Sequence, residues 1–335
     1  MKKKSAMSEL MEYAGKHKYL TYLSFALSGI SSLAALVPYY FIWKIIKEAV
    51  ECYPDFSRVK DIAANGRYAV ISAVAAMLIY FAALLCSHLS AFRVQRNIRT
   101  KAMEHIVSLP VGFMDDMGSG KVRKIVNDCS SATETYLAHN WPDKAGMMFT
   151  PIGLAVLLFA FDYKLGLLCL VPVAAALIFM SGMMGKNMQE KMKEYQDALA
   201  VMSNEAVEYV RGVPVIKTFG QSIFSFKRFK KTIDDYSEWA IAYTKMLTRP
   251  MLAFITAINA VFAVIIAAGI VISSDGITNT ELLNLMFYIV ITPIITVTLN
   301  KVAYAGENSM LVADSLERIH SIMDLKPLPE SSSPK

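Results

Sequence analysis

Charged residues are scarce in this sequence, and apolar residues dominate it. Only 19% of the 335 residues are Asp, Glu, Lys or Arg, whereas 55% are hydrophobic. An ordinary soluble domain carries about 25% charged residues, so this composition excludes such a domain and predicts a membrane protein. The formal net charge is +6, but the basic residues lie in blocks between apolar runs and form no nucleic-acid-binding pattern. We therefore expect the lipid bilayer, and no nucleic acid, as a partner.

Cysteine is also scarce, and its spacing excludes the usual cysteine chemistry. The four cysteines are Cys52, Cys86, Cys129 and Cys169, and they show neither a CxxC pair nor a Cys/His metal spacing. We interpret them as small apolar side chains and expect no metal site. The lysines at the N-terminus are not followed by an apolar segment with a cleavage site, so no signal peptide is expected.

Long apolar runs define the fold class. A helix needs about 20 mainly apolar residues to cross a bilayer, and six runs meet this requirement. They are residues 19–46, 67–91, 145–162, 165–185, 250–273 and 282–305. The sequence therefore predicts an all-α membrane protein with six transmembrane helices.

The segments between these runs are very unequal in length. A few residues around Asp162 join spans three and four, whereas long polar segments follow spans two and four. Residues 93–109, 121–140, 186–210 and 224–245 are typical of helix. Because they are too polar for lipid, we expect the spans to continue as helices beyond the membrane. Their many Lys and Arg residues predict a cytoplasmic location for the extensions and for both termini, in a multi-pass protein of the cell membrane.

The N-terminal residues 1–18 form a separate segment. Leu10, Met11, Tyr13 and Ala14 fall on one face of a short helix with lysines around it. This pattern favours an interfacial helix along the inner membrane surface over a frayed polar tail.

Two short stretches at the ends of the cytoplasmic extensions are the expected contact points for a partner. In the first, about residues 108–121, Pro110 ends a helix, Gly118 and Gly120 permit a turn, and Phe113 is an apolar side chain beside two acids. In the second, about residues 211–224, Gly and Pro again flank a short amphipathic piece. The chain is expected to break its helix at both places.

These stretches, taken in order, resemble ABC exporters. Residues 109–120 with Asn127-Asp128 resemble the first intracellular loop of that family, and residues 205–229 resemble the second. Residues 162–172 are similar to its tight external turn, and residues 313–329 to the connector that leads into its ATPase domain. The resemblance implies a transmembrane domain over residues 19–312 and a connector over residues 313–335.

The resemblance also implies how the stretches work. In ABC exporters the two tips are coupling helices that dock on nucleotide-binding domains, and two transmembrane halves pair as a homo- or heterodimer. The implied coupling residues are Phe113, Met114, Asp115, Asp116, Phe219, Gly220, Gln221 and Ser222. A rival interpretation is that Phe113 and Phe219 only pack between the extensions.

No ATP-binding motif is visible in the sequence. The stretch Gly118–Lys121 has neither the glycine spacing nor the Ser or Thr after lysine that a Walker A loop requires. We expect ATP and Mg²⁺ to bind a nucleotide-binding domain outside this chain. The chain itself is expected to have no catalytic site and no cofactor.

Polar side chains within the spans are candidates for a substrate path, because lipid disfavours them. They are Thr256 and Asn259 in span five, Thr292, Thr296, Asn300 and Lys301 in span six, and His88 in span two. Thr292, Thr296 and Asn300 are spaced by four and share one helix face. Each is equally well explained as a hydrogen-bonding contact between helices.

One further stretch resembles the siderophore-importer branch of the family, which includes yersiniabactin and mycobactin importers. It is residues 138–143, AHNWPD, just before span three. His139 is therefore a candidate ligand or sensor of a ferric compound, although a single His is more often an ordinary hydrogen-bonding residue.

The resemblance predicts alternating access in a dimer that exports an amphipathic compound, lipid or peptide. The same fold importing a metal-siderophore is the alternative. An ATP-independent channel, or a membrane scaffold or sensor, is the alternative of another class.

Overall fold

The structure is a computed structural model that describes residues 5–183, 186–219, 224–274 and 276–328. Within these residues the fold is helical, and six helical stretches are long and apolar enough to cross a membrane. These stretches are Ala6–Cys52, Ile62–Val107, Ser119–Phe161, Tyr163–Met183, Phe229–Ile272 and Asn279–Ala303. The chain is thus a multi-pass membrane protein, as its composition predicts.

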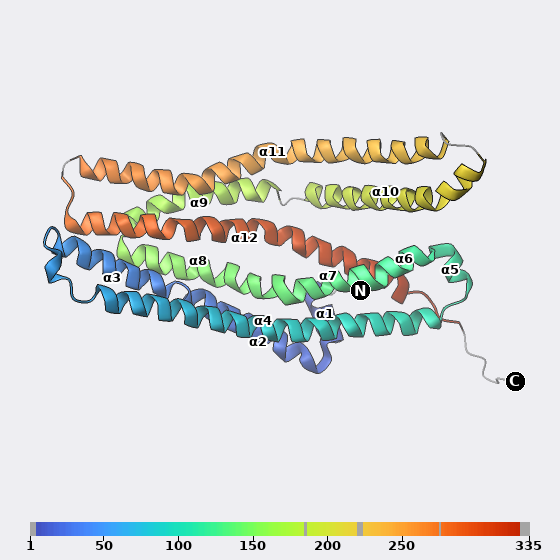
Figure 1. Ribbon diagram of the computed structural model, residues 1–335, viewed down its shortest axis with the longest axis horizontal. Helices are drawn as coiled ribbons and strands as arrows, with labels where there is room; N and C mark the ends of the chain where they lie inside the picture. Colours follow the sequence, from blue (N-terminus) through green and yellow to red (C-terminus); the bar gives the residue numbers. More distant parts are fainter. Residues whose placement is uncertain (1–4, 184–185, 220–223, 275, 329–335) are drawn as a thin grey trace. The chain divides into compact units, whose positions relative to one another are not determined.

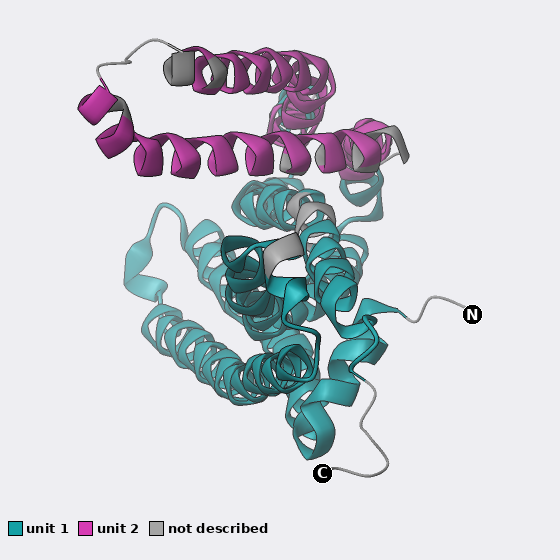
Figure 2. Ribbon diagram, turned by 90° about the vertical axis from the view of Figure 1, so that its right-hand side faces the viewer, with its two compact units in different colours: residues 1–167, 264–335 teal, residues 168–263 magenta. Residues whose placement is uncertain are grey.

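The chain divides into two compact units (Figure 2). The first comprises residues 1–167 and 264–335, and the second residues 168–263. The first unit opens with the N-terminal elements, which are α1 (Ala6–Ala14), η1 (Gly15–His17), α2 (Lys18–Ala34), α3 (Val37–Cys52) and η2 (Phe56–Arg58). It continues through α4 (Ile62–Val107), α5 (Gly112–Met117), α6 (Ser119–Lys124), η3 (Ile125–Cys129), α7 (Ser130–Thr135), η4 (Tyr136–Asn140) and α8 (Trp141–Phe161), and α12 (Asn279–Met323) closes it.

The first span is broken near its middle. The helix stops at Ala34 and resumes at Val37, with Pro38 in the first turn of α3. Proline has no N–H and fits the start of a helix, where that N–H would lack a partner. Pro38 thus lies where α3 begins after the break.

The long extensions are confirmed as helix. α4 runs without a break from Ile62 to Val107, and α12 from Asn279 to Met323, so the connector begins as a continuation of α12. The segment between α6 and α8 is also helical but contains two π-helical stretches, η3 and η4. Such stretches widen a helix by one residue and are common at functional sites.

The second unit contains α10 (Lys186–Phe219), α11 (Phe224–Ser273) as far as residue 263, and most of α9 (Tyr163–Met183). α10 and α11 lie side by side (Figure 1). Tyr195 stacks at 5.3 Å from Trp239, measured between ring centroids, and its hydroxyl accepts a hydrogen bond from Tyr236. Glu194 accepts hydrogen bonds from Lys191 and Trp239, which lower the pKa of its carboxyl.

The second tip differs from the expected broken loop. α10 continues through Gly212 and Pro214 as far as Phe219, so the helix does not end at residue 211. Proline inside a helix removes one backbone hydrogen bond and bends it without always ending it. The helix therefore continues eight residues past residue 211, to Phe219, and residues 220–223 lie outside the described residues.

The N-terminal helix α1 exists, and protein covers its apolar face. Ser5 caps its start by accepting a hydrogen bond from the Ser8 N–H. Leu10, Met11 and Ala14 are buried in a cluster with residues of α4 and of the end of α12. His320 of α12 contacts Glu9 at 2.6 Å. The face assigned from sequence to the membrane surface is thus occupied by protein, while the interfacial placement of α1 stays a prediction.

Truncating Leu10 tests this attachment. Its side chain is fully buried, so we expect Leu10→Ala to weaken the anchoring of α1 by about 2–5 kcal/mol. Faster proteolysis after α1 in detergent solution is the measurement. Ser8→Ala, on the exposed face of the same helix, is the control, and equal proteolysis of the two variants would contradict the packing role of Leu10.

Candidate functional site

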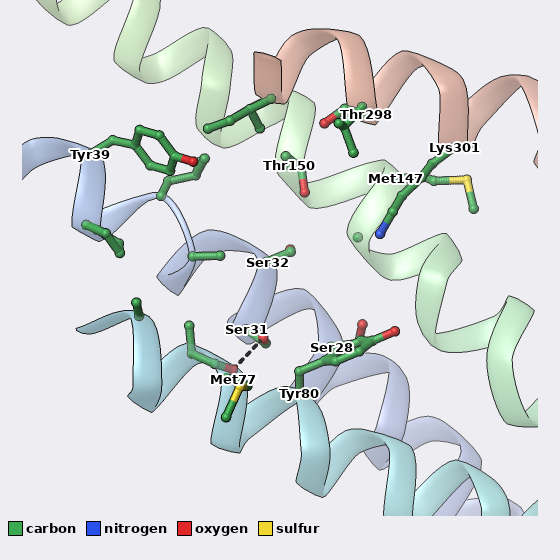
Figure 3. Close-up of a pocket in the computed structure, with 18 of the residues that line it drawn as sticks. Ser28, Ser31, Ser32, Tyr39, Met77, Tyr80, Met147, Thr150, Thr298 and Lys301 are labelled. Carbon is green, nitrogen blue, oxygen red and sulfur yellow. Dashed lines mark hydrogen bonds between the residues drawn. The ribbon is translucent and has the colours of Figure 1, made fainter. Parts of the chain in front are cut away.

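A cavity of about 530 Å³ lies within the first unit (Figure 3). Its lining comes from α2, α3, α4, α8 and α12. This volume falls in the range of small-molecule pockets. The lining includes Ser28, Ser31, Ser32, Leu36, Tyr39, Ile42, Met77, Tyr80, Asp143, Met147, Thr150, Ile294, Val297, Thr298 and Lys301.

The helices around the cavity are held together by serine hydroxyls. Ser31 of α2 donates to the Ala76 carbonyl of α4 at 2.8 Å, and Ser28 donates to the Pro142 carbonyl of α8 at 2.7 Å. Small hydroxyl side chains let helices approach closely and hydrogen-bond in lipid. These contacts position α2 against α4 and α8, and they fix the wall of the cavity.

Two opposite charges line the cavity. The Lys301 Nζ lies 4.0 Å from the Asp143 Oδ1, and the Tyr80 hydroxyl donates to the same Oδ1 at 3.0 Å. Lys301 is the one residue of the sequence-based substrate path that lines this cavity, whereas Asp143, Tyr80 and Thr298 were not singled out. The sequence feature that could have identified these three residues is a polar group inside or beside an apolar run.

The other span-six candidates lie on another face of α12. Ile294, Val297, Thr298 and Lys301 line the cavity at the spacing of one helix face. Thr292, Thr296 and Asn300 lie about half a turn away from that face at 3.6 residues per turn. Thr292 is buried and donates to the Tyr288 carbonyl at 2.7 Å. That this second face lines a substrate path stays a prediction.

The span-five candidates lie on α11 in the second unit. Thr256 and Asn259 are both exposed, and the Asn259 side chain donates to the Ile255 carbonyl one turn earlier at 2.8 Å. This local bond occupies the amide N–H without reaching another helix. Their role in a substrate path stays a prediction.

The structure brings His88 and His139 together. Their ring centroids lie 4.7 Å apart in an edge-to-face contact, and the His88 Nδ1 lies 3.9 Å from the Glu134 Oε1. His88 comes from α4, and His139 from the π-helical stretch η4. Over the described ranges, no group of three or more His, Cys, Asp or Glu residues is placed to hold a metal ion.

The first tip presents different apolar residues from the expected ones. Phe113 is partly buried and packs against the cluster of Ala102, Val122 and Val126, in the manner of the rival interpretation. Val111 is 86% exposed and Met114 is 39% exposed. The outward apolar surface of this tip is therefore Val111 with Met114. Asp115 and Asp116 lie in α5, and their side chains are outside the described part of the structure.

The geometry of this tip follows from its turn residues. α4 ends at Val107, shortly before Pro110, and α5 is followed by Gly118 with a φ of +78°. Glycine adopts positive φ without steric cost, which explains the turn between α5 and α6; Gly120 is ordinary helix. The Leu328 N–H donates to the Ser108 carbonyl at 2.9 Å, so the connector contacts the base of the tip.

The second tip presents Phe219 at the end of α10. Its side chain is 75% exposed, as a docking residue requires. Gly220, Gln221 and Ser222 lie outside the described residues, so their expected role in coupling stays a prediction.

Comparison with known proteins agrees with this architecture. Over 191 residues the chain is 29% identical to the mycobactin import ATP-binding/permease protein IrtA of Mycolicibacterium smegmatis, an alignment that covers 56% of this chain and 22% of that protein. Over 155 residues it is 28% identical to the ATP-dependent lipid A-core flippase 1 of Colwellia psychrerythraea, which covers 45% of this chain and 25% of the flippase.

The alignments thus span 22% and 25% of the length of these two relatives. The family model of the ABC transporter transmembrane region matches residues 21–294, which is most of the chain. The chain therefore belongs to the ABC transporter transmembrane family.

Proposed function

We propose that this chain is the substrate-translocating half of an ATP-driven transporter that works by alternating access. A second half completes the pathway, and nucleotide-binding domains dock on the two cytoplasmic tips. ATP and Mg²⁺ bind those domains. The observation that carries the proposal is the exposure of Val111 and Phe219 at the ends of long rigid extensions. Exposed apolar side chains at such places are typical of protein contact sites.

The physical route of coupling follows from the continuous helices. A displacement of the Val111 tip moves α4, which reaches the cavity at Tyr80 without a break. α12 connects the Lys301 end of the cavity to the connector in the same way. Closure of the docked domains would thus shift long packed helices between two arrangements.

The proposed cargo is an amphipathic compound, lipid or peptide, moved outward. The cavity supports this class because apolar side chains such as Leu36 and Ile294 line it together with the charged Lys301 and Asp143. Everted vesicles carrying the full-length protein and its partner half should accumulate an amphipathic dye only with ATP. Equal accumulation without ATP would instead indicate an ATP-independent carrier.

A second candidate is inward transport of a metal-siderophore. The contact between His88 and His139 favours it, as does the similarity to a protein named for mycobactin import. Right-side-out vesicles with ATP supplied inside should then take up a labelled ferric siderophore.

Replacing the exposed histidine tests this candidate. If His139 binds the ferric compound, His139→Gln should lower uptake about tenfold, the equivalent of one contact of about 1.4 kcal/mol. Dye efflux should not change. His17→Gln, at a histidine in η1, is the control, and normal uptake by His139→Gln would exclude His139 as a ligand.

A further inference from the structure

The cavity in the first unit has one charged region and one apolar region. Asp143 of α8 contacts both Lys301 of α12 and Tyr80 of α4. Leu36, Ile42 and Ile294 supply apolar surface to the same cavity. Figure 3 shows Lys301 extending from α12 into the cavity, with Tyr80 on the opposite wall. The lining is thus suited to a molecule with a polar head and an apolar body.

Lys301 and Asp143 face each other without a direct hydrogen bond. Their 4.0 Å separation exceeds the 2.7–3.2 Å of a direct N–H···O hydrogen bond. The side chains are 56% and 34% exposed, respectively. Asp143 contacts Lys301 and Tyr80 through the same oxygen, Oδ1, so Oδ2 remains as a second acceptor. Each charge can therefore contact a bound molecule while it still faces the other.

The neighbouring hydroxyls do not alter the charge balance of the cavity. The hydroxyl protons of Ser28, Ser31 and Ser32 are all donated to backbone carbonyls. These serines therefore present oxygen lone pairs to the cavity. Among the lining residues that the structure describes, Lys301 and Asp143 are the charged ones, so their charges cancel.

This cancellation determines which head group fits. A charge brought into a membrane-embedded site is costly unless a partner neutralises it. A purely anionic head would satisfy Lys301 but face Asp143, and a purely cationic head would do the reverse. A head that carries both charges satisfies both residues and leaves the site neutral.

We infer that the cavity binds an amphiphile with a zwitterionic head group. Its anionic group contacts Lys301, its cationic group contacts Asp143, and its apolar body lies against Leu36, Ile42 and Ile294. This assignment rests on the proposed function, because it defines the chemical class of the cargo.

Direct binding to the full-length protein in nonionic detergent tests the inference. The probes share one fluorescent acyl tail and differ in the head: a zwitterionic lysophosphatidylethanolamine, an anionic lysophosphatidylglycerol and a cationic alkyltrimethylammonium. Fluorescence anisotropy gives each Kd. The zwitterionic probe should bind about tenfold more tightly than either other probe, the equivalent of one satisfied contact.

The variants should change this preference in opposite directions. Asp143→Asn should remove the advantage over the anionic probe, and Lys301→Gln the advantage over the cationic probe. The exchange of both charges, Asp143→Lys with Lys301→Asp, should restore the zwitterionic preference and provides a test where a single variant fails to fold. Lys47→Gln is the matched control, because Lys47 forms a similar 3.9 Å pair with Glu51 outside the cavity.

Equal affinities of the three probes, or preferences that neither single variant changes, would overturn the inference and leave Lys301 and Asp143 as an interhelical ion pair. The proposed function fails separately, when ATP drives no movement although the zwitterionic probe binds selectively. ATP-driven transport of other amphiphiles with no charge preference in binding would refute the zwitterionic site alone.

Discussion

Val111→Asp is expected to lower substrate-stimulated ATP hydrolysis of the assembled transporter at least about tenfold, with an unchanged melting temperature. Val111 is 86% exposed at the first tip, so its replacement disturbs no packing within the chain. A groove that receives the valine would have to bury an aspartate, and burial of an unpaired charge costs several kcal/mol. Since 1.4 kcal/mol corresponds to a factor of ten, docking should be lost. Detergent-solubilised ATPase activity with and without substrate is the measurement.

Two comparisons make this prediction specific. Val201→Asp places the same charge on an exposed valine within α10, away from its end, and should retain coupling. Phe113→Ala should instead lower stability by about 2 kcal/mol, less than a fully buried phenylalanine would lose, because Phe113 packs against the cluster of Ala102, Val122 and Val126. Normal coupling in Val111→Asp together with uncoupling in Phe113→Ala at unchanged stability would return the docking role to Phe113.

The sequence predicted the helices of this protein well because their signals are local. Apolar runs gave the spans, and the polar helical segments gave the extensions. Pro110 and Gly118 marked points where a helix ends or turns, since both residues act on their own backbone. The prediction for the second tip was wrong in one respect. The helix continues past Pro214, because a proline does not always end a helix.

The sequence predicted the site less completely, for a physical reason. In a membrane helix most faces are apolar, so periodicity does not show which face meets a neighbouring helix. Thr292, Thr296 and Asn300 formed a convincing polar face, yet the face of α12 that reaches the cavity contains Thr298 and Lys301. Likewise, Phe113 is the largest apolar side chain of its tip, and this size suits it to packing inside the extension.

The contact of His88 with His139 also depends on tertiary structure. The sequence indicates a separate role for each histidine, and only the packing of α4 beside η4 shows that the two rings meet. In the same way, Asp143 was part of a short stretch of family resemblance, and its pairing with Lys301 emerges only from the approach of α8 to α12. Pairs of residues far apart in sequence are what sequence patterns leave undetermined.

The tight turn between spans three and four is held by α12. Tyr288 is fully buried, and its hydroxyl lies 2.5 Å from the Leu158 carbonyl and 2.6 Å from the Asp162 carbonyl. Both carbonyls lie at the end of α8 and also accept hydrogen bonds from backbone N–H groups, the Leu158 carbonyl from Asp162 at 3.3 Å and the Asp162 carbonyl from Gly166 at 2.9 Å, so the hydroxyl is an additional donor to them. One turn earlier, Asn284 donates to the Asp162 side chain at 3.3 Å. α12 thus adds side-chain hydrogen bonds to the backbone ones at this end of α8.

Tyr288→Phe should therefore lower the free energy of unfolding by about 0.5–1.5 kcal/mol, because it removes a buried hydrogen bond while the backbone N–H donors to the two carbonyls stay in place. Tyr288→Ala also removes a buried ring and should cost about 3–5 kcal/mol. Thermal unfolding in nonionic detergent gives both values. Tyr163, 61% exposed at the same turn, provides the control, and Tyr163→Phe should be neutral. If Tyr288→Phe were as stable as that control, the carbonyls would have to be satisfied without the hydroxyl. The stability of the turn would then have to come from ring packing, such as the stacking of Phe161 on Phe287 at 3.9 Å.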